Sequence, residues 1–71
     1  MEPRIIGVPT KEILEKLAEI YKAKGATVAE IEGDIVAYFP SGNVVHVFLN
    51  PDVKLEDKKR FLMSEALNGI R

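Results

Sequence analysis

Residues 27–49, TVAEIEGDIVAYFPSGNVVHVFL, decide the fold because they contain three strand-like runs separated by two turn signals. The runs, at residues 27–32, 34–39 and 44–49, are rich in β-branched and aromatic residues, which favour strands. Glycine in the pair Gly33-Asp34 permits the positive φ of a short hairpin turn, and the residue types of PSGN, residues 40–43, all suit tight turns. The stretch therefore predicts a three-stranded antiparallel meander.

A helix is predicted on each side of this meander. In residues 11–25 the apolar positions recur at three- and four-residue spacing, which is typical of one helical stripe. Thr10 suits the N-cap, and Gly25 suits the left-handed residue that ends a helix. A second helix is predicted from about Leu55 to Asn68. The stripe of the first helix consists of Ile13, Leu14, Leu17, Ala18, Ile20 and Tyr21.

The element order is therefore α-β-β-β-α, an α+β fold with two helices packed on one face of the sheet. We expect residues 1–9, with two prolines and a glycine, to be a loose lead-in and residues 10–71 to form a single domain. A chain of this length buries only about 60% of the surface that its unfolded form exposes. Cysteine is absent and there is one histidine, so no disulfide, metal or cofactor is expected. Good packing or oligomerisation must then provide the stability.

Composition narrows the classes of function. Ten basic and eleven acidic residues give a net charge of −1, so no long-range field attracts the chain to nucleic acid or to a membrane surface. No apolar run approaches the ~20 residues of a membrane span, and the first residues have no signal-peptide core. We interpret the protein as cytoplasmic. Abundant Lys and Glu, with no Gln, Cys or Trp, resemble hyperthermophile usage.

The registers of the hairpins determine which face of the sheet receives the helices. If the second turn uses all four residues of PSGN, one face carries Thr27, Ala29, Ile31, Val36, Tyr38, Val45, Val47 and Leu49, and we expect the helices there. The other face then carries an apolar set around the histidine, Ile35, Phe39, Val44, His46 and Phe48. A one-residue bulge would move the third strand to the opposite face, and Tyr38 would then join this set.

An apolar set on a sheet face is typical of an interface. We therefore predict a homodimer or a larger assembly through this face, with another protein as the alternative partner. His46 has no nucleophile or ligand set near it in the sequence, so we interpret it as a strand residue near the interface, not as an enzyme's general base. An active RNase that uses His46 remains a third hypothesis.

Two groups of charged residues are further candidates. Glu30 and Glu32 would lie on one strand face ~6.6 Å apart, a spacing close to that of glycosidase carboxylates, but we expect no cleft in a chain this small and assign both to solvent. Lys58, Lys59 and Arg60 begin the second helix, where backbone amides also favour phosphate. We interpret them, and Glu65 further along, as a solvated face. The alternative is a nucleic-acid-binding site.

The order of elements, the length and the basic start of the last helix resemble the double-stranded RNA-binding domain, and more closely the HicA-type toxins, mRNA interferases with the same fold. The resemblance covers residues 11–70 and is carried by the order and spacing of Gly25, Gly33, the Pro40-Ser41-Gly42 turn, Val44 to Val47, Pro51 and Leu55. Those toxins place a catalytic histidine where this chain has Ile35. The resemblance therefore implies an RNA-binding relative that has lost RNase activity.

Overall fold

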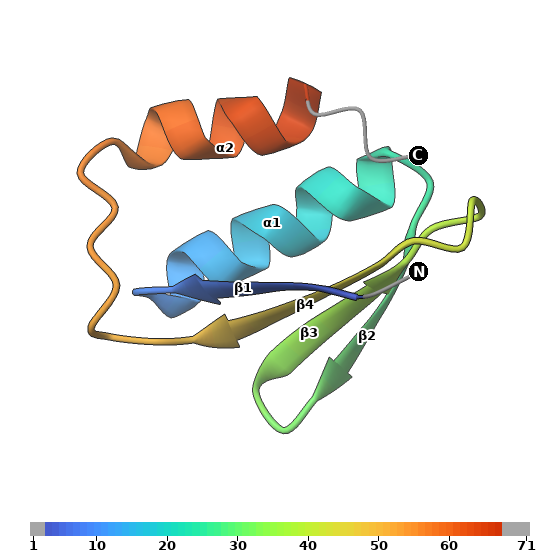
Figure 1. The fold of residues 1–71 in the computed structure, drawn as a ribbon, viewed down its shortest axis with the longest axis horizontal. Coiled ribbons are helices and arrows are strands. Elements are labelled where there is room, and N and C mark those ends of the chain that lie inside the picture. The colour runs from blue at the N-terminus through green and yellow to red at the C-terminus, as the bar shows by residue number, and fades with distance from the viewer. Residues whose placement is uncertain (1–2, 68–71) are drawn as a thin grey trace.

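The computed structural model describes residues 3–67 of the chain as an α+β fold in the order β-α-β-β-β-α (Figure 1). The elements are β1 (Arg4–Val8), α1 (Lys11–Ala23), β2 (Thr27–Ile31), β3 (Asp34–Tyr38), β4 (Val44–Leu49) and α2 (Lys58–Leu67). Helix α1 contacts all four strands on one side and α2 on the other, so it lies between the sheet and α2 (Figure 1).

The sheet has four strands in the order β1-β4-β3-β2. The predicted antiparallel meander is present as β2, β3 and β4, but it is incomplete, because β1 pairs in parallel with β4 from Arg4 opposite Val45 to Val8 opposite Leu49. The expected loose lead-in therefore contains a strand. Its five residues lie between Pro3 and Pro9, and prolines at both ends of so short a segment are typical of a loop.

Helix α1 follows its sequence pattern. The Thr10 hydroxyl accepts a hydrogen bond from the Ile13 amide at 3.3 Å, as an N-cap does. The helix ends at Ala23, and Gly25 has a φ of +96°, the left-handed conformation that glycine adopts without strain. Its apolar stripe packs on the sheet. The buried core comprises Val8, Ile13, Leu14, Leu17, Tyr21, Ile35, Ala37, Phe39, Val45 and Val47.

Both hairpins differ from the expected registers. The first turn is Glu32-Gly33, with φ values of +49° and +86°, and Ile31 pairs with Asp34. Two positive φ values are those of a type I′ turn. In the second hairpin Tyr38 pairs with Val44, so the turn contains five residues, and its Phe39 amide donates to the Asn43 carbonyl at 2.9 Å. This is the bulged alternative, one residue longer than PSGN.

The bulge reverses part of the expected assignment of faces. Ile35 and Phe39, expected at an interface, are buried in the core under α1. Val44, His46 and Phe48 do lie on the face away from the helices, but they share it with Val36 and Tyr38 instead of with Ile35 and Phe39. A shift of one residue has this effect because successive strand side chains point to opposite faces.

Glu65 on α2 is buried, although we expected it in solvent; it is 2% exposed. The Tyr21 hydroxyl donates to Glu65 Oε1 at 2.6 Å, and Arg4 Nη2 donates to Oε2 at 3.0 Å. The Lys24 ammonium donates to the main-chain carbonyl of Glu65 at 2.7 Å. One residue of α2 is thus bonded to β1, to α1 and to the residue that follows α1.

These polar contacts matter because α2 has no continuous apolar stripe. Phe61 and Leu62 are half-buried and pack on the core, but Met63 and Leu67 are exposed. A buried carboxylate is tolerated only where donors compensate for its lost hydration. The helix begins at Lys58, three residues after the predicted start at Leu55, and the predicted end at Asn68 lies outside the described residues.

Replacing Tyr21 with phenylalanine is expected to destabilise the protein by about 1–3 kcal/mol, because Glu65 then loses a buried donor. Urea unfolding measures the change. Tyr38→Phe is the matched control: this hydroxyl lies on the exposed side of the sheet, and we expect a change within about 0.5 kcal/mol. Equal unfolding midpoints for the two variants would contradict the structural role of the Tyr21–Glu65 bond.

Candidate functional site

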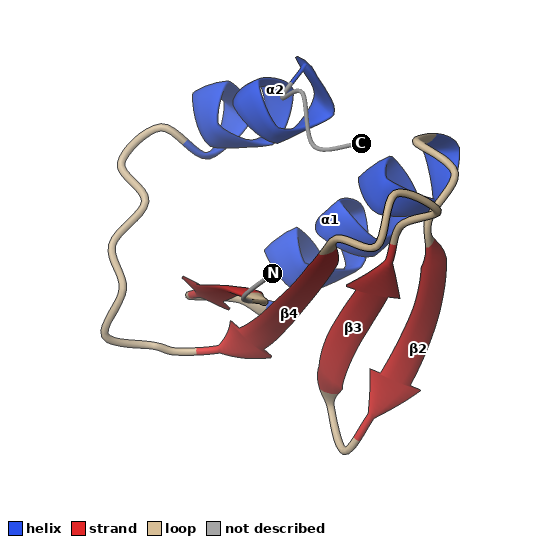
Figure 2. Cartoon of the chain, turned by 45° about the vertical axis from the view of Figure 1, so that its right-hand side comes forward, coloured by secondary structure: helices blue, strands red, loops and turns tan. Residues whose placement is uncertain are grey.

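The sheet face opposite α1 is the candidate functional site, and we call it the open face. No helix within residues 3–67 contacts it, and Figure 2 shows it toward the viewer, with α1 behind the strands. All four strands contribute side chains to it. They are Ile5, Thr27, Ala29, Ile31, Asp34, Val36, Tyr38, Val44, His46 and Phe48, with Gly7 between them.

Large apolar side chains of the open face are exposed to water. Ile5 is 66% exposed, Ile31 51% and Tyr38 48%. Sequence reasoning missed Ile5 because its strand was not expected, and it assigned Ile31 to the helix side. One signal in the sequence favours the observed register: Asp34 and His46 share a face only when the second turn is bulged, and strand residues with charged or polar side chains belong on the side away from the core.

A glycine in β1 makes room for the Phe48 ring on the open face. A Cβ atom on Gly7 would lie 3.1 Å from Phe48 Cζ and 3.2 Å from Asn50 Cβ. Both distances are shorter than ordinary carbon–carbon contacts. The Phe48 ring therefore lies over the backbone of β1, and any larger residue at position 7 would displace it.

His46 and Asp34 form a pair on the two central strands of the open face, near the β2–β3 turn. His46 Nε2 lies 3.1 Å from Asp34 Oδ2, and both side chains are about two-fifths exposed. The ring of His46 also meets Phe48 edge-on, with 6.4 Å between centroids. A carboxylate beside an imidazole orients it, as in hydrolytic triads, but a triad also requires a nucleophile. The aliphatic hydroxyl of the open face belongs to Thr27 on β2, and β3 separates that strand from His46 on β4.

The described residues also offer no obvious metal centre. No group of three or more His, Cys, Asp or Glu side chains within residues 3–67 is arranged to hold a metal ion. Over the same part of the chain, neither helix is long and apolar enough to cross a membrane.

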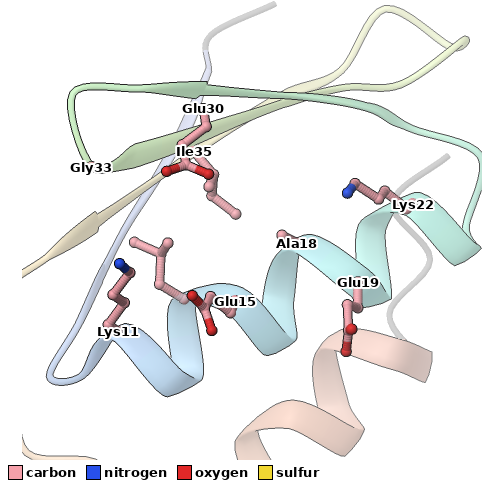
Figure 3. A pocket seen from close by; sticks show the side chains of 9 residues that line it. Lys11, Glu15, Ala18, Glu19, Lys22, Glu30, Gly33 and Ile35 are labelled. Carbon is pink, nitrogen blue, oxygen red and sulfur yellow. The ribbon is translucent and has the colours of Figure 1, made fainter.

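A groove of about 300 Å³ lies on the other side of the sheet, between α1 and the β2–β3 hairpin (Figure 3). It corrects the expectation that so small a chain has no cleft. Glu30 points from β2 toward α1 and lines the groove, whereas Glu32 lies in the turn. The two carboxylates therefore do not share a strand face, and the paired arrangement of glycosidases is not present.

Lys58, Lys59 and Arg60 occupy the start of α2 and are exposed, as predicted. Consecutive helical residues point about 100° apart, so the three side chains do not form one patch. The Arg60 amide is bound by the carboxylate of Asp57 at 2.9 Å. A phosphate at this helix terminus would therefore meet a negative side chain.

The pKa of Tyr21 is strongly raised. Burial raises the pKa of its hydroxyl far above the ordinary value, and the hydrogen bond to Glu65 raises it further. Shifted groups often mark active sites, but the Tyr21 side chain is fully buried and its hydroxyl contacts Glu65. We assign it to the structure of the core.

No family model matches the chain, and no curated protein or solved structure gives a significant match to it. The assignment of a site therefore depends on the geometry described above.

The Tyr38→Phe protein, in which Tyr21 is the single remaining tyrosine, provides a test of this burial. Unfolded tyrosine ionises near pH 10, and the folded pKa of Tyr21 is raised. The contribution of Tyr21 to stability is therefore complete below about pH 10 and falls as pH rises above it. Absorbance at the tyrosinate wavelength should increase only together with loss of the circular dichroism signal. An increase in the folded protein would show that Tyr21 is accessible.

Proposed function

We propose that this protein is a non-catalytic association domain that forms a homodimer through its open face. The observation that carries the proposal is the composition of that face. Its exposed side chains are mainly apolar, and its carboxylate, Asp34, lies 3.1 Å from the imidazole of His46. Exposed apolar surface of this kind on a folded domain favours a protein partner.

Symmetry favours a second copy as the partner. In a two-fold dimer the same patch meets itself, so the polar groups of the patch must include both hydrogen-bond donors and acceptors. The Asp34–His46 pair meets this condition, because a copy rotated by the two-fold axis brings an acceptor toward a donor and a donor toward an acceptor. Ile5 and Ile31, on the two outer strands, lie on either side of this pair.

The dimensions of the sheet indicate a weak dimer. Four strands ~4.8 Å apart and five residues long at ~3.3 Å each give a face of roughly 19 by 17 Å. That footprint is smaller than the ~800 Å² per partner of a standard interface. We therefore expect a dissociation constant in the micromolar range, about 1–100 μM.

Sedimentation equilibrium between about 10 and 300 μM, a range that brackets the expected dissociation constant, tests the dimer. Ile5→Lys and Phe48→Glu should both weaken association at least about ten-fold, because each places a charge in a desolvated contact. Phe48→Glu should also lower stability, since its ring packs over β1, whereas the highly exposed Ile5 tests the interface without that effect.

The matched control for Ile5→Lys is Leu67→Lys, an exposed apolar residue on α2, away from the sheet. It should leave dimerisation unchanged. A wild-type protein that stays monomeric at about 300 μM, above the whole expected range of the dissociation constant, would reject the proposal.

The alternative proposal is an RNA-binding domain related to HicA-type toxins, and the exposed Lys58, Lys59 and Arg60 favour it. We expect labelled single- and double-stranded RNA to bind weakly, without the steep salt dependence of many phosphate contacts. Titrations at about 50 and 200 mM salt measure this, since six or more such contacts would lose about 10³-fold in affinity over that range.

The deciding variant for RNA is the replacement of all three basic residues by alanine. Tight, salt-sensitive binding that this variant loses would establish the alternative in place of self-association. Cleavage of the RNA that is abolished in His46→Ala would instead establish a nuclease.

A further inference from the structure

Strand β2 is an edge strand with backbone groups available for pairing. Among the described strands its neighbour is β3 alone. The residues that flank a two-residue turn, here Ile31 and Asp34, exchange both backbone hydrogen bonds, and such pairs alternate along an antiparallel ladder. The N–H and C=O groups of Val28 and Glu30 therefore point away from β3. An edge of this kind is a template for a further strand.

The groove beside α1 lies next to this edge. Its floor consists of Leu14 and Ala18 on α1 and Ile35 on β3; it is narrow, because Leu14 and Ile35 are almost fully buried, and most of the exposed lining around it is polar. A strand added to β2 would direct every second side chain to the helix side of the sheet, and those side chains would enter the groove. A volume of about 300 Å³ is at the lower end for ligand pockets, and it suits a few side chains better than a large ligand.

The length of the groove matches a short peptide strand. Lys11 and Lys22 line its two ends on α1 (Figure 3). Eleven helical steps between them span about 16 Å, which equals about five residues of strand at ~3.3 Å each. Three of those five side chains would face the groove.

The charged residues that line the groove indicate which side chain the middle residue of the added strand should have. Lys11 and Glu15, and likewise Glu19 and Lys22, are spaced to compensate each other along α1. Glu30 faces them from β2 (Figure 3), and within residues 3–67 it forms no ion pair. Three carboxylates and two ammonium groups line the groove, so its lining carries one more negative than positive charge.

A second copy of this chain is a poor occupant of the groove. If β2 paired with its own copy about a two-fold axis, both Glu30 side chains would lie on the same side of the joined sheet, near each other. Like charges on neighbouring strands are destabilising. The occupant should instead supply a positive charge.

We propose that the β2 edge and the α1 groove bind an extended segment of a partner protein as a fifth strand, with apolar side chains on the floor and a lysine or arginine against Glu30. This site is independent of the proposed dimer, which uses the opposite face of the sheet. Each is therefore testable without the other.

The probe is a capped seven-residue peptide with the sequence Thr-Val-Thr-Lys-Thr-Val-Thr. In an extended strand its two valines and its lysine share one face. Added to ¹⁵N-labelled protein, it should shift the amide signals of Val28, Glu30 and Ala18 and bind with a dissociation constant below about 1 mM. Glutamate in place of its lysine should weaken binding about three- to ten-fold. Methylation of alternate peptide nitrogens, which removes the ladder donors but keeps every side chain, should abolish it.

The charge-reversal variant Glu30→Lys should prefer the glutamate peptide. Its matched control is Glu12→Lys, an exposed acid of α1 that does not line the groove, and this variant should keep the preference for lysine. Circular dichroism confirms that both variants fold. The proposal is overturned by absence of shifts at about 1 mM peptide, by shifts confined to β1 or the open face, or by equal binding of the methylated peptide.

Discussion

The hydrogen bonds of Glu65 determine where the last helix lies. Helix α2 has too little continuous apolar surface to be held by burial alone, and its one buried polar residue meets donors from β1 and α1. Apolar contacts tolerate sliding, whereas a carboxylate between a phenol and a guanidinium has one satisfactory position. Loss of one donor to such a buried group typically costs about 1–3 kcal/mol, a large part of the stability of so small a domain.

The second constraint is the length of one turn. Five residues instead of four connect β3 to β4, and the hydrogen bond between Phe39 and Asn43 closes the loop. The additional residue of the turn puts His46 beside Asp34 on the open face and leaves Val45 and Val47 in the core. The same backbone choice therefore determines both the packing under α1 and the chemistry presented to a partner.

The sequence patterns predicted those elements of the fold that depend on interactions between nearby residues. The periodicity of α1, its cap at Thr10 and its stop at Gly25 lie within about four turns of chain, and the structure confirms them. The three strands of the meander were also predictable. The parallel strand β1 was not, because its partner is about forty residues away and its glycine is explained only by the Phe48 ring.

The candidate sites were predictable to a smaller extent. Val44, His46 and Phe48 were assigned correctly to the side away from the helices, but Ile35 and Phe39 were not, because alternation alone does not determine a hairpin register. Glu65 resembled a solvated helix residue, since its partners Tyr21 and Arg4 lie 44 and 61 positions away. Glu30 lines a groove only because α1 lies opposite it, and the sequence alone did not predict that arrangement.

The pairing of β1 has a consequence for how the chain folds. The meander and α1 form from nearby residues, but β1 must pair in parallel with β4, and Arg4 then contacts a helix near the other end of the described chain. Contacts between distant residues form slowly, because loop closure comes before any stabilisation. On a ribosome, β1 emerges first yet completes its interactions only after α2 has been synthesised.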